Sequence, residues 1–154
     1  MYDVSMQAPL MMRWPGHIKP NSVNTNMVQT IDYAPTILGA AGIPVPAWMQ
    51  GIDLVPVITG KQKTLSRQNL YYHFYEYKAD HTVLQHLGIR GERYKLIYFY
   101  TVNEWELYDL KTDPDEQKNL VNSASHQHIV RQMKKELLRS RNQYDDHEPA
   151  GELR

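Results

Sequence analysis

The sequence GIRGERYKLIYFY at residues 88–100, followed by WELYDLKTDPDEQKNL at residues 105–120, decides the fold that we expect. Apolar and polar side chains alternate along these segments, as they do in strands with one buried face. Two aromatic-rich segments before them, residues 70–77 and 83–89, also read as strands. The four segments predict an antiparallel meander in which Gly91 forms a tight hairpin with a positive φ.

A long amphipathic segment, residues 125–144, follows the strands. Its apolar side chains recur at spacings of four: Ile129, Met133 and Leu137. This periodicity predicts a helix that covers one face of the sheet, so the expected fold class is α+β. In the first strand, we expect the side with Leu70 and Phe74 to face the core. Residues 145–154 are polar, and we expect a frayed tail.

The N-terminal part of the chain has a different pattern. The apolar run APLMMRW at residues 8–14 predicts a short strand buried on both faces, which needs neighbouring strands. The sequence DYAPTILGAAG predicts a helix from Asp32 to about Gly42. Residues 43–60 contain several prolines and predict irregular chain with one helical turn at residues 54–58. The segment therefore reads as a strand, a loop and a helix from a larger α/β structure.

The composition excludes several classes of function. Seventeen basic residues balance seventeen acidic ones, so no strong field attracts nucleic acid or an acidic membrane. The absence of Cys removes disulfides, thiolate metal sites and cysteine nucleophiles. We find no apolar stretch of transmembrane length, and the first residues lack the regions of a signal peptide. Neither nucleic acid nor a membrane is an expected partner.

Motifs in the order MQAPLMMRWPGHIKPNSV (residues 6–23), DYAPTILGAAGIPVP (32–46) and MQGIDLVPVITG (49–60), continued by the two segments quoted first, resemble the C-terminal part of the sulfatases. The similarity is greatest to the glycan-desulfating branch that includes the N-sulphoglucosamine sulphohydrolases. The resemblance implies that residues 1–66 are a remnant of the alkaline-phosphatase-like α/β catalytic subdomain. It implies that residues 67–154 are the sulfatase C-terminal subdomain.

The reactive motifs of that family are not found in the sequence. Sulfatases use a formylglycine made from Cys or Ser in a Cys/Ser-x-Pro-x-Arg motif, beside a bound calcium, and neither version of the motif occurs here. The resemblance implies that calcium and formylglycine belong to an N-terminal catalytic subdomain, which is the expected partner. We therefore predict no catalytic residue and no metal ligand in this chain, and no sulfuric ester hydrolysis by it alone. The family is usually periplasmic, secreted or lysosomal.

Three residues are candidates for contact with a sulfated saccharide. By the resemblance, the segment HTVLQHLGIR reaches the sugar, which makes His86 the first candidate and His81 the second. Arg90 is the third, with a structural role in the hairpin as its competing interpretation. The alternative for all three is an ordinary polar residue. Asp113 and its acidic neighbours predict a turn held by side-chain hydrogen bonds instead of a calcium loop.

Three functions stay open at this point. The chain is the C-terminal part of a sulfatase that contributes walls to a substrate pocket, a free-standing module that binds sulfated glycans, or an interaction domain without a ligand. The apolar strand expected at residues 8–14 favours the first, because an independent module would not keep a strand that completes another sheet.

Overall fold

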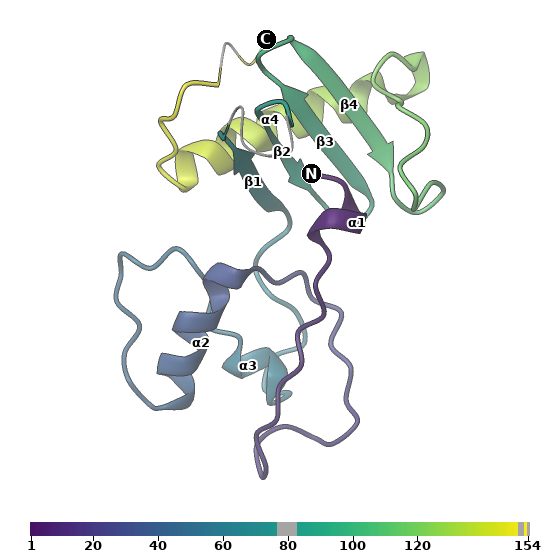
Figure 1. Cartoon of the computed structure of the whole chain (residues 1–154). Coiled ribbons are helices and arrows are strands. Elements are labelled where there is room, and N and C mark those ends of the chain that lie inside the picture. The colour runs from purple at the N-terminus through teal and green to yellow at the C-terminus, as the bar shows by residue number, and fades with distance from the viewer. Residues whose placement is uncertain (77–82, 151–152, 154) are drawn as a thin grey trace. The chain divides into compact units, whose positions relative to one another are not determined.

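A computed structural model describes residues 1–76, 83–150 and 153 of the chain (Figure 1). The chain forms two compact units. One is built from residues 9–70, and the other from residues 1–8 together with residues 71–154. The predicted division into subdomains at residue 66 stays a prediction. None of the helices in the described part of the chain is long and apolar enough to span a membrane.

The larger unit contains a four-stranded sheet in the order β1-β2-β3-β4, as expected for a meander. The strands are β1 (Leu70–Phe74), β2 (His86–Arg90), β3 (Tyr94–Phe99) and β4 (Glu104–Asp109). Both the β2–β3 and the β3–β4 pairings are antiparallel, and their register places Ile89, Leu96 and Leu107 side by side. The predicted α+β class and antiparallel sheet are confirmed.

Helix α4 (Gln127–Gln143) covers one face of this sheet (Figure 1). A short 3-10 turn, η2 (Ala124–His126), leads into it. The buried cluster between helix and sheet is apolar: Leu87, Ile89, Leu96, Tyr98, Leu107, Val130, Met133, Leu137 and Ala150. The predicted amphipathic helix is therefore confirmed, and removal of this apolar surface from water stabilises the unit.

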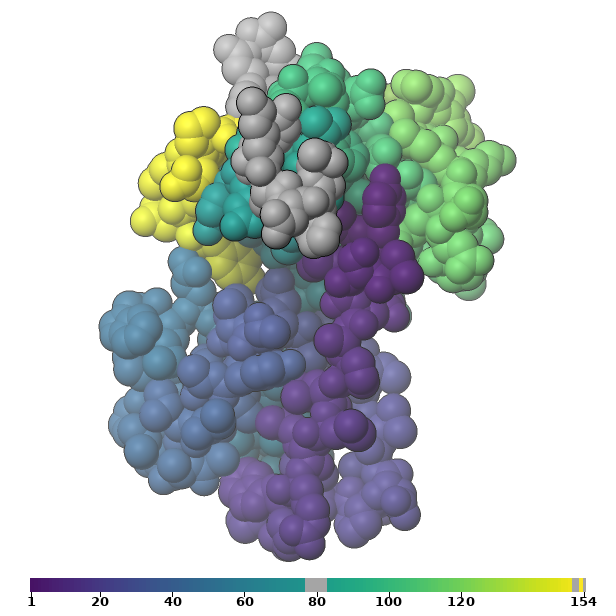
Figure 2. All heavy atoms as spheres, in the orientation of Figure 1, coloured from purple at the N-terminus to yellow at the C-terminus, as the bar shows by residue number. Residues whose placement is uncertain are grey.

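The first eight residues of the chain cover the opposite face of the sheet. They include the single-turn helix α1 (Asp3–Met6). Met1 is buried against Ile97 and Tyr108, with Tyr2 packed at the edge of this second cluster. A side chain at Gly88 would lie 2.7 Å from Met1 Sδ, so the segment approaches the sheet backbone closely. The space-filling view shows this segment, in purple, against the strands in green (Figure 2).

In β1, Tyr71 packs on the cluster beneath α4, whereas Tyr72 packs on the opposite cluster. Both sides of the strand therefore contact a buried cluster, and the expected core side, with Leu70 and Phe74, is the side of Tyr72. The expectation for the hairpin was wrong. Gly91 does not have a positive φ. Its N–H donates to Tyr94 O at 2.8 Å, which closes the hairpin without a left-handed residue at this position.

The expected frayed tail is also corrected. Ala150 is only 2% exposed, and the carboxylate of Asp146 accepts hydrogen bonds from Tyr71 and from His73, the latter at 2.7 Å. Arg141 of α4 donates to the backbone oxygen of Asp146 at 3.0 Å. The residues after the helix are thereby attached to β1, because two donors on that strand hydrogen-bond to one partly buried carboxylate.

The unit of residues 9–70 is built around a buried ion pair. It contains η1 (Thr30–Asp32), α2 (Tyr33–Ala40) and α3 (Val55–Ile58), which confirm the predicted helix and helical turn. The guanidinium of Arg67 donates two hydrogen bonds to the carboxylate of Asp32, at 2.6 and 2.7 Å. The same carboxylate accepts from Ile52 N at 2.8 Å. Burial alone would raise the pKa of Asp32, but Arg67 and the backbone donors outweigh it and lower that pKa.

The strand predicted at residues 8–14 is not observed. These residues have no regular secondary structure, and the Met11 side chain is 88% exposed. A strand buried on both faces needs hydrogen-bonded neighbours, and the described residues of the 9–70 unit contain no sheet that could provide them. The apolar run is present in the sequence, but nothing in this unit pairs with it.

Candidate functional site

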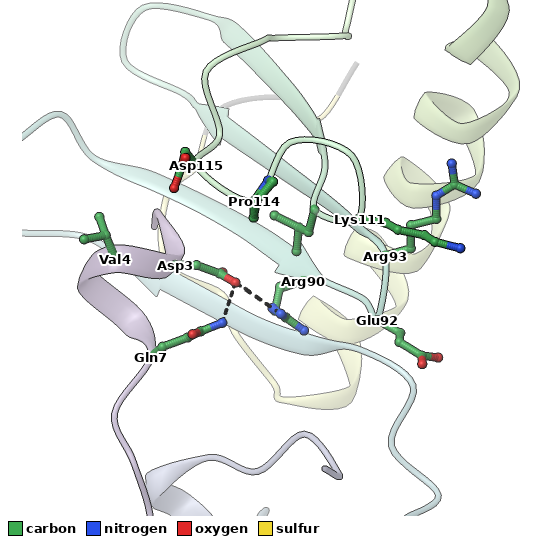
Figure 3. Close-up of a pocket in the computed structure, with 10 residues that line it drawn as sticks. Asp3, Val4, Gln7, Arg90, Glu92, Arg93, Lys111, Pro114 and Asp115 are labelled. Carbon is green, nitrogen blue, oxygen red and sulfur yellow. Dashed lines mark hydrogen bonds and ion pairs between the residues drawn. The ribbon is translucent and has the colours of Figure 1, made fainter.

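A depression of about 910 Å³ lies on the larger unit, beside the segment of residues 1–8 (Figure 3). Polar and charged side chains from three parts of the unit line much of it. They come from α1 and its C-cap, from the β2–β3 hairpin and from the turn after β4. The lining residues are Asp3, Val4, Gln7, Arg90, Glu92, Arg93, Leu110, Lys111, Pro114 and Asp115. Such a surface offers both donors and acceptors to a polar ligand.

Asp3 occupies the centre of the polar contacts in this depression. Figure 3 shows its carboxylate between Gln7 and Arg90, which donate to it at 2.8 and 3.1 Å. The ammonium group of Lys95 forms a further ion pair with Asp3 from beneath. Burial alone would raise the pKa of Asp3, but hydrogen bonds from Arg90 and Lys95 outweigh it and lower that pKa. Asp3 is therefore ionised at neutral pH.

Lys95 is the most deeply buried charged residue of this face, with a relative exposure of 1%. Besides Asp3, its ammonium group pairs with Glu116 at 2.7 Å and donates to Met1 O at 3.0 Å. Glu116 in turn accepts a hydrogen bond from Asp3 N at 2.5 Å. Two cations, Arg90 and Lys95, thus meet two carboxylates, and the cluster is neutral as a whole.

A second ion pair lies at the rim of the depression. The guanidinium of Arg93 donates to both carboxylate oxygens of Asp109, at 2.9 and 2.7 Å. The hydrogen bond from Arg93 is the largest influence on this carboxylate and lowers the pKa of Asp109 to about 2. The Arg93 side chain is half exposed, so the pair joins the hairpin to β4 in contact with solvent.

His86 lies beneath the N-terminal segment and not in the depression. It is 3% exposed, and its ring is surrounded by Tyr72, Phe74 and Phe99. Nδ1 lies 2.8 Å from Leu84 O, and Nε2 lies 3.1 Å from the nitrogen of Met1. Burial lowers the pKa of His86, so the imidazole is neutral at pH 7. This position favours the interpretation of His86 as a buried polar residue with satisfied nitrogens.

The three predicted site residues do not form one group. His81 lies outside the described residues. Arg90 follows His86 on the same face of β2, because side chains four positions apart share a face, but only Arg90 reaches the depression. Its pairing with Asp3 agrees with a structural role in the hairpin. Contact between these residues and a saccharide stays a prediction.

Sequence reasoning missed Lys95 and Asp3. A signal for Lys95 was available, because it alternates with Ile97 and Phe99 and therefore had to share the face of two apolar side chains. A lysine in that position needs a buried acidic partner. The partner could not be deduced, since Asp3 is far from Lys95 in sequence and lies in a segment without a strong pattern.

The acidic turn after β4 has the predicted construction. The two carboxylate oxygens of Asp113 accept from the backbone of Gln117 at 3.0 Å and of Lys118 at 2.8 Å. Across residues 1–76, 83–150 and 153, no group of three or more His, Cys, Asp or Glu side chains is arranged to hold a metal ion.

Comparison with known proteins identifies the family. The family model described as N-sulphoglucosamine sulphohydrolase, C-terminal, matches residues 1–143. The chain belongs to this family of sulfatase C-terminal regions. The resemblance seen in the sequence motifs is confirmed.

Individual relatives agree with this assignment. The chain is 40% identical to an N-acetylglucosamine-6-O-sulfatase of Bacteroides thetaiotaomicron, a match that covers 97% of this chain and 27% of the relative. It is 34% identical to a Delta 4,5-hexuronate-2-O-sulfatase of the same organism, covering 84% and 27%. Human arylsulfatase A is 30% identical, covering 80% and 28%. The chain therefore spans about a quarter of the length of these curated relatives.

Solved structures show the same fold. A protein solved in complex with its substrate D-glucosamine-2-N,6-O-disulfate superposes with a TM-score of 0.85 at 40% identity, over 90% of this chain and 28% of that chain. A phosphonate monoester hydrolase of Silicibacter pomeroyi superposes with a TM-score of 0.73 at 24% identity, over 88% of this chain and 29% of that one. The second likeness concerns the fold alone.

Proposed function

We propose that this chain is the C-terminal region of a sulfatase that acts on sulfated glycans, that it contributes walls to the substrate pocket, and that it has no sulfatase activity alone. The observation that carries the proposal is the match of the family model to residues 1–143, combined with a length of about a quarter of the relatives. The partner is an N-terminal sulfatase subdomain, which supplies formylglycine and calcium.

The proposed inactivity follows from chemistry. Sulfate-ester hydrolysis needs an activated nucleophile and a cationic group that stabilises charge on the sulfuryl oxygens. The sequence has neither Cys nor a Ser-x-Pro-x-Arg motif from which formylglycine could be made. The cationic groups of Lys95 and Arg90 are already paired with carboxylates. No residue of this chain is therefore assigned a catalytic role.

The exposed apolar side chains of the 9–70 unit support the need for a partner. Met11, Val23 and Trp48 are 88%, 90% and 77% exposed, and Ile37 on α2 is 67% exposed. A protein that functions alone rarely exposes so many large apolar side chains. We therefore expect the isolated chain to associate with itself or to precipitate.

The proposal also covers the substrate class and the residues that form the pocket wall. The relative with 40% identity is a sulfatase of N-acetylglucosamine, and the superposable structure contains a sulfated glucosamine. A sulfated amino sugar is accordingly the substrate class that we propose for the assembled enzyme. His81, His86 and Arg90 are the proposed contacts, with Arg90 the one that lines a surface depression among the described residues.

The test is a chimera in which this chain replaces the matching region of the B. thetaiotaomicron N-acetylglucosamine-6-O-sulfatase. We expect the matured chimera to release sulfate from N-acetylglucosamine-6-sulfate, and the chain alone to release none above a boiled control. Sulfate would be measured by ion chromatography. The unmodified relative serves as the positive control.

Two results would contradict the proposal. Turnover by the chain alone would show that it contains its own reactive group. A monodisperse chain that binds the sulfated sugar without any partner, measured by calorimetry, would instead favour the free-standing glycan-binding module.

A further inference from the structure

Residues 1–8 belong to the same unit as residues 71–154, but in the sequence residues 9–70, which form the other unit, lie between them. Few interactions within the segment hold its shape, because α1 has a single turn and its N-cap makes no side-chain hydrogen bond. Its conformation therefore depends on what it contacts on the sheet.

Those contacts are concentrated at its start. Lys95 donates to Met1 O, Tyr2 donates to Glu106 at 2.9 Å, and Asp3 binds Lys95, Arg90 and Glu116. From Val4 onward, side-chain contact decreases, and Val4 itself is 92% exposed. The segment is thus fixed at residues 1–3 and is less constrained as it approaches Pro9.

The buried cluster fixes the segment in one register only. The ammonium group of Lys95 lies at the sheet face and is 1% exposed, so leaving it without its two carboxylate partners would be costly. Glu116 also accepts from Asp3 N, which ties backbone and side chain of the same residue to the cluster. A shift of the segment by one residue would leave buried charges without partners.

We propose that Asp3, Lys95 and Glu116 are positioning residues, which fix residues 1–8 on the sheet and thereby set where the C-terminal unit stands against the catalytic part of the sulfatase. This inference rests on the proposed function. Residues 1–8 continue along the chain into the 9–70 unit, which under the proposed function is a remnant of the catalytic part. A rigid attachment at Asp3 keeps pocket walls from this unit at a constant distance from the reacting bond.

The first experiment is made in the sulfatase chimera, because the isolated chain is expected to associate, and its readout does not depend on sulfatase activity. Hydrogen exchange of residues 2–7 is compared among the unmodified chimera, Lys95→Met and Asp3→Asn. We expect exchange in this segment to rise about tenfold or more in both variants, while α4 keeps its protection. Lys118→Met removes an exposed lysine near the same turn and serves as the control. Unchanged exchange in both variants would overturn the proposal.

The second experiment measures the sulfatase activity of the same chimera variants. Two substrates are compared: the sulfated amino sugar and a small aryl sulfate that does not extend to the pocket walls. We expect kcat/KM for the sugar to fall about tenfold, mainly through KM, and kcat/KM for the aryl sulfate to change less than about twofold. Lys95→Arg keeps the charge and should recover part of the loss.

The outcomes separate the two proposals. An inactive unmodified chimera would overturn the proposed function and, with it, the positioning role. If the unmodified chimera is active but the substitutions lower kcat/KM equally for both substrates, the positioning role alone is overturned, because that result indicates general destabilisation. The positioning role is also overturned if the substitutions leave kcat/KM unchanged for both substrates.

Discussion

The two faces of the sheet are covered by different means. A long helix buries one face through apolar side chains such as Leu96, Met133 and Leu137. An eight-residue segment covers the other face through a smaller apolar cluster and a buried charge cluster around Lys95. The first arrangement tolerates small shifts, since apolar contact is non-directional. The second specifies position, because ion pairs and hydrogen bonds require particular partners.

The largest expected effect comes from the helix-covered face. Leu137→Ala removes a fully buried side chain and should lower the free energy of unfolding by about 2–5 kcal/mol. Urea denaturation followed by circular dichroism measures this change. The neighbouring Leu138 is 43% exposed, so Leu138→Ala should cost much less. Equal losses at both positions would contradict the described packing of α4.

Acid should loosen the segment-covered face first. The pKa of Asp3 is lowered in the folded protein, so its ion pairs contribute stability that is present above its ordinary pKa of 3.8 and is lost as pH falls through the lowered value. The buried side chains of the cluster under α4 carry no charge, and the one carboxylate described at its edge is Asp146, on Tyr71. Proton NMR from pH 6 to pH 2 should show signals of residues 1–3 changing before those of Leu137. Simultaneous change would contradict the comparison.

A single hydrogen bond on the segment-covered face should have a smaller effect. Tyr2→Phe removes the hydroxyl that donates to Glu106 but keeps the ring against Tyr108. We expect a loss of about 0.5–1.5 kcal/mol, together with faster exchange in residues 2–7. Thermal unfolding and hydrogen exchange measure the two effects. A loss as large as that of Leu137→Ala would show that this face depends on Tyr2 far more than the charge cluster suggests.

The smallest effect is expected on the outer surface of α4. Arg139 and Glu136 form an exposed ion pair at 3.8 Å. Arg139→Ala should change the free energy of unfolding by no more than about 0.5 kcal/mol, because solvent screens such pairs. Denaturation at low and high salt provides the check. A larger, salt-dependent loss would mean that the helix surface contributes more than its exposure indicates.

The same contrast explains which parts could be predicted from sequence. The strands and α4 follow from local periodicity, and α2 follows from the local proline and glycine pattern, although the Asp32 side chain pairs with Arg67 and does not cap this helix. The positions of Met1, Asp3 and Asp146 depend on partners far along the chain, which a local pattern does not identify. His86 illustrates the limit: the family resemblance made it a candidate contact, whereas its burial under Met1 depends on a partner far along the chain.

The strand expected at residues 8–14 shows that a local pattern can also predict an element that does not form. Its apolar composition was recognised correctly, but composition alone does not provide the hydrogen-bonded neighbours that a strand needs. For the candidate site, Arg90 was identified, whereas Lys95 was overlooked although it alternates with two apolar residues. A charged residue inside an apolar alternation is therefore the signal to follow in related sequences.

The interrupted construction of the sheet-containing unit has a consequence during translation. Residues 1–8 emerge from the ribosome long before Lys95 and Glu116 are synthesised, yet these two residues provide their buried partners. Residues 1–8 therefore stay without these partners while more than a hundred further residues are synthesised. Their attachment to the sheet forms only after Glu116 has been added, and the segment is open to chaperones and proteases until then.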